Sequence, residues 1–256
     1  ATSGRILVEN EDVTLLPATD RDVSMVFQSY ALFPHMSVLE NVSYGLKMIN
    51  VPKEEFTEKS LETLKLVNLE GYENRMPSEL SGGQQQRVAV ARAIVLKPKV
   101  LLFDEPLSNL DAKLRRQVRE DIREIQQKLG VTTIYVTHDQ EEALAISDKV
   151  IVMNNAIIAQ QGSPKELYNF PKTKFVANFI GDANVVKAEI INQNNNIYEI
   201  QLAEMKINIE SDQKLESSVS VSLRPEKITI SKSPEENSIH ASVNNASFVG
   251  NSYQYI

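Results

Sequence analysis

The 256-residue sequence has a formal net charge of −7, 42% hydrophobic residues, 24% charged residues and no cysteine. Its length and composition are typical of one folded domain with a small second domain and argue against a disordered chain, and the lack of cysteine excludes a disulfide scaffold. The negative charge argues against broad attraction to DNA or to anionic lipid, and the longest apolar runs are too short to cross a bilayer.

The first part of the chain predicts a strand followed by helices. Residues 23–27 form a short apolar run that is typical of a strand. Ser37 and Glu40 have capping-box spacing, so a helix is expected to begin near Val38. Residues 53–69 place apolar side chains among charges, which predicts an amphipathic helix.

A further helix is expected after Ser81, where apolar residues recur near helical spacing. It should stop at Lys97, because Pro98 disfavours helical backbone in the residue before it. Together these helices predict a helical subdomain at about residues 37–97.

The middle of the chain alternates strands with helices. Residues 100–103 are continuously apolar, as in a strand buried on both faces of a parallel sheet. Residues 114–129 predict a long helix that ends at Gly130. A strand, a short helix and a strand then follow, at residues 132–136, 139–147 and 149–153. This alternation predicts a parallel α/β sheet.

From about Val185 the pattern changes to period two. Residues 185–202 hold two apolar runs around an asparagine cluster, which predicts a β-hairpin, and residues 218–231 continue the alternation. These features predict a second, all-β domain, linked to the first through residues 162–181. The final residues, 246–256, predict a strand that ends before a partner strand appears.

The stretch ELSGGQQQR contains a predicted helix start. Ser81 and Gln84 can form a capping box around Gly82 and Gly83, and a well-capped helix is the simpler interpretation. Capping alone does not require two glycines, which let another backbone or a phosphate approach closely. Free N–H groups and the helix dipole therefore favour an anion site.

Polar residues also follow three predicted strands. Asp104 and Glu105 stand where open α/β sheets bind ligands, so Asp104 can hold Mg²⁺ through its water shell while Glu105 polarises an attacking water. The alternative is a polar turn. His138 can contact a γ-phosphate or be a surface residue, and Gln28 can join the Mg²⁺ shell or be an exposed turn residue.

Together LSGGQQQR, LLFDEPLSNLD, VTHD and VFQSYALFPHM resemble the ATP-binding-cassette (ABC) ATPases, most closely those of bacterial solute importers with a C-terminal β-domain. The resemblance runs along the whole chain, and FIGDANVV and SLRPEKITI are similar to parts of that β-domain. It implies an α/β, P-loop NTPase-like core at residues 1–178, incomplete at its N-terminus. An OB-like regulatory β-domain, incomplete at its C-terminus, is implied at residues 179–256.

The resemblance also implies roles for residues at the matching motif positions. They are the Q-loop glutamine Gln28, the signature residues Ser81, Gly82, Gly83 and Gln84, the Walker B residues Asp104 and Glu105, the D-loop Asp111 and the switch residue His138. Glu105 and His138 would be catalytic, Gln28 and Asp104 would hold Mg²⁺, and ATP and Mg²⁺ would be the cofactors. After Gln28, a contact with a membrane subunit is implied for Tyr30, Leu32, Phe33 and Met36, some of which are alternatively core residues.

The implied partners are a second ATPase subunit, transmembrane permease subunits and, indirectly, an extracytoplasmic solute-binding protein. Two ATPase subunits would pair head to tail, so that the signature motif of one covers the γ-phosphate held by the P-loop of the other. The implied location is peripheral, on the cytoplasmic face of the inner or plasma membrane. No nucleic-acid partner is expected.

The sequence departs from the family in one respect. None of its nine glycines is followed by lysine, so G-x-x-x-x-G-K-[ST] is missing. The aromatic residue that would stack on adenine would likewise stand ahead of Ala1. We therefore expect the sequence as given to be a fragment of a complete subunit and not to bind ATP tightly.

The predicted function is ATP hydrolysis that energises solute uptake. One alternative is a non-catalytic ABC-type interaction module, which the missing P-loop favours and the presence of Glu105 and His138 disfavours. A second is an ABC ATPase acting on DNA, which the acidic charge and the lack of heptads disfavour. The arginines at 115–123 alternate with acidic residues and predict helix-surface ion pairs. The solute (ferric iron, polyamine, phosphonate or sugar) and any ligand of the β-domain are left open.

Overall fold

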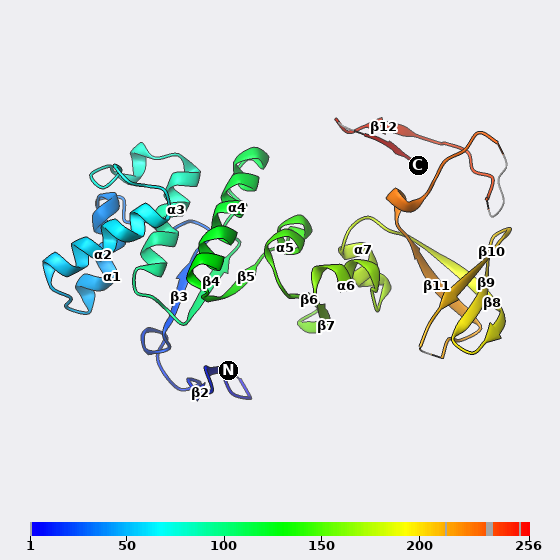
Figure 1. The fold of residues 1–256 in the computed structure, drawn as a ribbon, viewed down its shortest axis with the longest axis horizontal. Coiled ribbons are helices and arrows are strands. Elements are labelled where there is room, and N and C mark those ends of the chain that lie inside the picture. Colours follow the sequence, from blue (N-terminus) through cyan, green and yellow to red (C-terminus); the bar gives the residue numbers. More distant parts are fainter. Residues whose placement is uncertain (1, 213, 234–237, 251) are drawn as a thin grey trace. The chain divides into compact units, whose positions relative to one another are not determined.

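The computed structural model describes residues 2–212, 214–233, 238–250 and 252–256. The chain forms two compact units, Ala1–Asp148 and Lys149–Ile256, and each is described by itself (Figure 1). No helix in the described part of the chain combines the length and the apolar character that a bilayer span requires.

The first unit contains a three-stranded parallel sheet. Its strands are β3 (Val23–Val26), β4 (Val100–Asp104) and β5 (Thr132–Val136), in the order β3-β4-β5. The predicted parallel α/β sheet is therefore confirmed. The strand β4 is not buried on both faces as predicted, because Leu101 and Phe103 enter the core while the alternate residues Val100 and Leu102 are only half-buried.

Five α-helices belong to this unit in its described residues. They are α1 (Val38–Met48), α2 (Lys53–Leu66), α3 (Gly82–Ile94), α4 (Ala112–Leu129) and α5 (Gln140–Ile146). Ser37 caps α1 in the predicted capping box, and Gly130 ends α4 with a left-handed φ of 61°. The helices α2 and α3 are shorter than predicted, because Asn68 (φ 58°) and Lys97 (φ 52°) take up left-handed backbone shortly after each helix ends.

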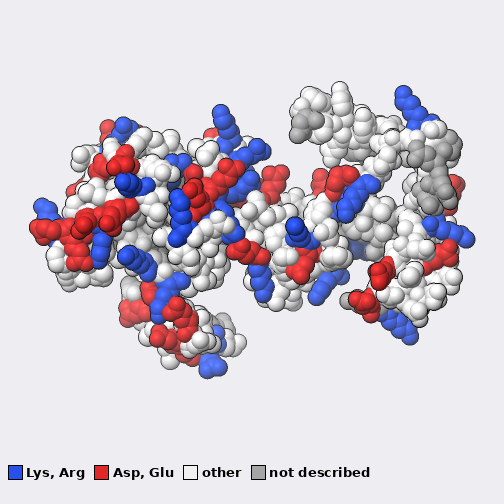
Figure 2. All heavy atoms as spheres, viewed as in Figure 1, with Lys and Arg blue, Asp and Glu red and all other residues white. Residues whose placement is uncertain are grey.

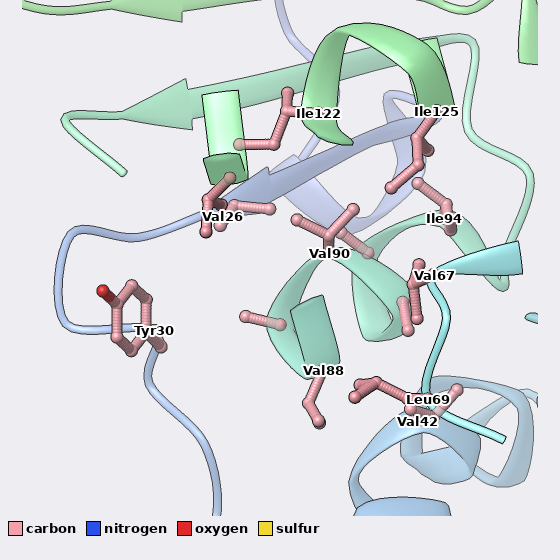
Figure 3. Packing of buried hydrophobic residues seen from close by; sticks show 14 of the residues in the cluster. Val26, Tyr30, Val42, Val67, Leu69, Val88, Val90, Ile94, Ile122 and Ile125 are labelled. Atoms are coloured by element: carbon pink, nitrogen blue, oxygen red, sulfur yellow. The ribbon is translucent and has the colours of Figure 1, made fainter. Parts of the chain in front are cut away.

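The core of this unit lies between one face of the sheet and the helices. Figure 3 shows Val26 of β3, Val90 of α3 and Ile122 of α4 among its buried side chains. On the opposite face of the sheet, Met25 and Ile134 are exposed in the described structure. Helix α4 buries Val118, Ile122 and Ile125, as predicted, whereas its terminal Leu129 is exposed.

Charged side chains of both signs intermingle on the face of α4 that Figure 2 shows. The arginines of this helix pair with acidic residues, but their partners differ from those predicted. Arg123 contacts Asp148 at 2.5 Å, while Asp121 of the same helix pairs with Arg87 of α3 at 2.5 Å. These ion pairs therefore join α4 to neighbouring segments, which the helical spacing alone did not indicate.

Short elements flank these structures. A ribbon of β1 (Leu7–Val8) and β2 (Glu11–Asp12) precedes β3.

In the second unit, β6 (Val150–Asn154) pairs antiparallel with β7 (Ile157–Gly162). The prediction that residues 149–153 continue the parallel sheet is therefore wrong. Asn155 and Ala156 both have positive φ, so they form a tight two-residue turn that folds the chain into a hairpin.

The rest of the second unit is mainly β-structure. Helices α6 (Pro164–Asn169) and α7 (Lys174–Phe179) precede a four-stranded antiparallel sheet. This sheet has the order β10-β9-β8-β11, with strands β8 (Asn184–Asn194), β9 (Ile197–Leu202), β10 (Met205–Glu210) and β11 (Ser218–Leu223). The predicted hairpin at 185–202 is confirmed as β8 and β9.

Two predictions near the end of the chain need correction. The strand predicted at residues 218–231 ends at Leu223, because Pro225–Lys227 forms a 3₁₀ turn. The final segment is not an unpaired strand, since β12 (Ala246–Phe248) pairs antiparallel with β13 (Tyr253–Tyr255). Gly250, with a φ of 94°, lies between these two strands and allows the chain to fold back.

Candidate functional site

The parallel sheet brings four of the predicted site residues to one edge. Gln28 follows β3, Asp104 ends β4 with Glu105 directly after it, and His138 follows β5. Because the strands are parallel neighbours, their carboxyl ends meet at the same side of the sheet. Nδ1 of His138 lies 3.2 Å from Oε2 of Glu105. These two side chains are 74% and 32% exposed, so the pair faces solvent and is open to a ligand.

The backbone of Glu105 has an uncommon conformation. Its φ is 44°, in the left-handed region that costs a residue with a β-carbon about 1–2 kcal/mol. The N–H of Glu105 donates to the carbonyl of Val136 at 3.0 Å, which ties the end of β4 to the end of β5. Backbone strain of this kind is stored at functional sites more often than elsewhere.

Gln28 is joined to the loop that follows Glu105. Its Nε2 donates to Oγ of Ser108 at 3.0 Å, and Ser108 Oγ in turn donates to the carbonyl of Glu105 at 3.0 Å. Asn109 Nδ2 donates to the carbonyl of Gln28 at 3.1 Å. Ser108 and Asn109 were not among the predicted site residues. Their place in LSNLD, between Glu105 and Asp111, is the signal in the sequence that marks them.

Asp111 caps the helix α4. Its Oδ1 accepts from the backbone N–H groups of Lys113 at 3.1 Å and Leu114 at 3.0 Å. A local capping role therefore accounts for one carboxylate oxygen of this exposed residue. The predicted role of Asp111 toward a nucleotide stays a prediction.

The glycine-containing helix start forms the predicted capping box. Ser81 Oγ accepts from the N–H of Gln84 at 3.4 Å, and Gln84 Oε1 accepts from the N–H of Ser81 at 2.9 Å. A Cβ on Gly83 would lie 2.9 Å from Cδ1 of Leu114, and one on Gly82 would lie 3.1 Å from Cδ2 of a leucine, Leu110. The close approach of these two leucines thus explains why glycine suits both positions. The role of the two glycines toward a phosphate stays a prediction.

The two groups of predicted nucleotide contacts are not bonded to each other within the described chain. Gln84 Nε2 reaches Tyr72 OH at 3.2 Å, and no hydrogen bond from Ser81 or Gln84 extends to Glu105 or His138. Each group is therefore held by its own neighbours.

A buried network behind His138 was not predicted. Glu142 is 3% exposed, and its Oε2 accepts from Thr137 Oγ1 at 2.8 Å and from Tyr135 OH at 3.1 Å. Burial and the nearby Glu142 raise the pKa of Tyr135. Arg115 NH1 contacts Asp139, the residue after His138, at 3.4 Å. Thr137 and Asp139, the two residues next to His138 in the chain, are therefore both held by side-chain contacts.

The residues at the sheet edge fit a divalent cation by their donor chemistry. Asp104 and Gln28 offer a carboxylate and an amide oxygen on exposed side chains, which suit a Mg²⁺ ion that keeps several waters. Among the described residues, no group of three or more His, Asp or Glu side chains is arranged as a complete protein cage for a metal. The predicted role of Asp104 and Gln28 in holding Mg²⁺ stays a prediction.

The residues predicted to contact a membrane subunit differ in exposure. Tyr30 is 7% exposed and belongs to the core, whereas Leu32, Phe33 and Met36 are half-buried. The ring of Phe33 lies 4.6 Å from that of Tyr44, between ring centroids. The mixture of core and surface positions was expected, and the membrane contact itself stays a prediction.

Comparison with protein families finds two matches. Residues 1–108 match the family described as ABC transporter, and residues 221–256 match the family described as TOBE domain. The structure of cbiO1 from Clostridium perfringens, titled as part of the ABC transporter complex cbiONQ, is similar with a TM-score of 0.60 and 33% identity. This similarity covers 65% of the present chain and 68% of cbiO1.

Two similar proteins carry the name "Fe(3+) ions import ATP-binding protein FbpC". The one from Rhizobium etli is 52% identical over 254 residues, which are 99% of this chain and 72% of that protein. The one from Agrobacterium fabrum is 58% identical over 228 residues, or 89% of this chain and 65% of that protein. The chain therefore spans about two thirds of the length of these relatives.

Proposed function

Since this chain belongs to the ABC transporter family, with the predicted α/β core and a C-terminal TOBE domain, we propose that the full-length protein hydrolyses ATP to drive bacterial import of ferric iron. The observation that carries this proposal is the pairing of Glu105 with His138 at 3.2 Å, on the sheet edge where Gln28 and Asp104 also stand. The names of the similar proteins support ferric iron over polyamine, phosphonate or sugar.

In this proposal Glu105 is the general base. Its carboxylate accepts a proton from the water that attacks the γ-phosphate. The imidazolium form of His138 would donate through Nδ1 to that carboxylate, which it orients, and through Nε2 toward the phosphate. Gln28 and Asp104 would hold Mg²⁺, which when bound supplies positive charge against the phosphate oxygens. The bonds from Ser108 and Asn109 keep Gln28 beside the loop that carries Glu105.

A second copy of the protein would complete the nucleotide site. The capped start of α3, with Ser81 exposed and Gly82 half-buried, offers backbone N–H groups and a helix dipole to an anion. Ser81 and Gln84 bond to each other, and Gln84 also bonds to Tyr72. Following the head-to-tail pairing of the family, we assign this anion to the γ-phosphate bound by the partner copy. Asp111, at the start of α4, would contribute to the same shared interface.

The proposed domain organisation and membrane partner follow the family. Residues 1–178 would form the ATPase domain, with the helical subdomain at about 37–97, and residues 179–256 the regulatory β-domain. The half-buried Phe33 and Met36 would contact a permease subunit, which would hold the protein peripherally at the cytoplasmic face of the membrane. An extracytoplasmic solute-binding protein would deliver ferric iron to that permease.

The test compares the full-length protein with its Glu105→Gln variant in a Mg²⁺-dependent ATPase assay. Loss of a general base should slow turnover by roughly 10²–10⁴-fold. Glu124→Gln is the matched control, because Glu124 is an exposed residue of α4 that pairs only with Lys128 in the described structure. Equal turnover in all three proteins would remove Glu105 from its role. Uptake assays with ferric iron, a polyamine and a sugar would identify the solute.

A further inference from the structure

The loop after Gln28 turns through two residues with a backbone conformation that L-amino acids seldom adopt. Tyr30 has a φ of 61° and its neighbour Ala31 a φ of 48°. Consecutive left-handed residues persist only where their surroundings hold them. The buried ring of Tyr30 is one such support, since it belongs to the same hydrophobic core as Val88 of α3 (Figure 3).

Arg92 of α3 provides the second support. Its terminal nitrogens donate to the carbonyl of Ala31 at 2.7 Å and to the carbonyl of Tyr30 at 2.8 Å. The guanidinium carbon also lies 5.4 Å from the centroid of the Phe33 ring. Burial lowers the pKa of Arg92, so the environment of this cation is partly desolvated. One planar group therefore holds the carbonyls of both left-handed residues.

Through its helix, Arg92 connects the loop after Gln28 to the start of α3. Helix α3 is continuous for 13 residues, with Ser81 at its N-cap and Arg92 in its last turn. The other end of the loop is fixed at Gln28, through its bonds to Ser108 and Asn109. The loop therefore bridges the signature helix and the segment that carries Glu105.

We propose that Arg92 is a positioning residue that fixes the loop after Gln28 to the signature helix, so that a movement of either one is transmitted to the other. The inference rests on the proposed function, because the movement affects transport only if Phe33, on the same loop, contacts the permease. Arg92 acts through the backbone of Tyr30 and Ala31. A lysine keeps the charge but cannot present the planar fork that binds two carbonyls together.

The first experiment measures hydrogen exchange in the full-length protein and its Arg92→Lys variant. Amides of residues 29–33, 35 and 36 should exchange at least about 10-fold faster in the variant, while amides of α5 and of the β8–β9 hairpin keep their rates. Arg87→Lys is the matched control, because Arg87 lies on the same helix and pairs with Asp121 at 2.5 Å instead. Unchanged exchange in the loop, or an equal rise in both variants, would overturn the proposal.

The second experiment uses the assembled transporter. Arg92→Lys should reduce the stimulation of ATP hydrolysis by the membrane subunits about 5-fold or more, while the KM for ATP of the isolated protein stays within about twofold. Arg87→Lys should keep full stimulation. Full stimulation in Arg92→Lys, or a loss that follows lowered thermal stability in both variants, refutes the coupling role.

The two readouts separate this inference from the proposed function. Hydrogen exchange requires neither ATP nor a membrane partner. If the unaltered protein hydrolyses no ATP but its loop still depends on Arg92, the proposed function fails and the positioning role stands. If the protein is active but Arg92→Lys changes neither readout, the positioning role fails alone.

Discussion

The two halves of the candidate site are held together in different ways. At the sheet edge, Gln28, Glu105 and His138 are far apart in the sequence and are joined by contacts across strands and loops. At the start of α3, Ser81 and Gln84 satisfy each other within four residues. The first half is assembled by the tertiary fold, whereas the second is a local helix start. Substitutions should therefore affect activity and stability differently in the two halves.

After Glu105→Gln, the next largest effect is expected from His138→Ala in the full-length protein. Loss of a positioned donor at a phosphate should reduce ATP turnover about 10²-fold. The melting temperature should change little, because the side chain is 74% exposed. His240→Ala, at an exposed histidine of the second unit, is the control. Comparable turnover in both variants would mean that the sheet edge is not the catalytic half.

Substitution of Gly83 should mainly affect stability. Gly83→Val places branched atoms where even a Cβ would be 2.9 Å from Leu114, and overpacking of this kind costs about 1–3 kcal/mol. Gly83→Ala is the matched variant, because the flexible end of Leu114 can shift and alanine favours the helix. Urea denaturation measures both variants. If Gly83→Val is as stable as Gly83→Ala, packing does not explain this glycine.

Ser81→Ala tests whether the helix start does more than cap. Loss of the cap should lower the free energy of unfolding by about 1 kcal/mol. Ser37→Ala removes the equivalent capping box of α1 and should have a similar effect on stability. Only Ser81→Ala should also slow ATP turnover, because the proposal places Ser81 against the partner's nucleotide. An identical ATPase rate in the two variants would leave Ser81 with a capping role alone.

The smallest effect is expected from Ser108→Ala. The change removes the hydrogen bond from Gln28 and the bond to the Glu105 carbonyl, with a loss of about 1 kcal/mol in unfolding free energy. ATP turnover should fall by less than about tenfold, because Asn109 still bonds the backbone of Gln28. A Mg²⁺ titration of the ATPase rate checks the effect on Gln28. An unchanged Mg²⁺ requirement would separate Ser108 from the metal site.

Local signals in the sequence predicted the local structures well. The capping boxes at Ser37 and Ser81, the end of α4 at Gly130 and the hairpin of β8 and β9 each depend on residues close together in the chain. Motif resemblance located Gln28, Glu105 and His138 at the ends of three strands. The family membership inferred from those motifs is confirmed by the matches to known proteins.

Pairing between segments was harder to predict. The sequence around Val150 is apolar enough for a parallel sheet. In the structure this strand instead pairs antiparallel with β7, through a turn in which Asn155 and Ala156 have positive φ. Similarly, nothing in the pattern showed that Leu114 occupies the space left by Gly83 or that Ser108 binds Gln28. These contacts depend on the tertiary fold, which periodicity does not describe.

The left-handed backbone of Glu105 restricts which amino acids are tolerated there. Asparagine and aspartate adopt a φ near 44° more readily than other residues, and glycine does so without strain, whereas valine, isoleucine and threonine are strongly disfavoured. Homologues that lost the carboxylate during evolution should therefore carry glycine or asparagine more often than a branched apolar residue. The left-handed backbone at the end of the strand would then be retained in homologues that no longer use a carboxylate there.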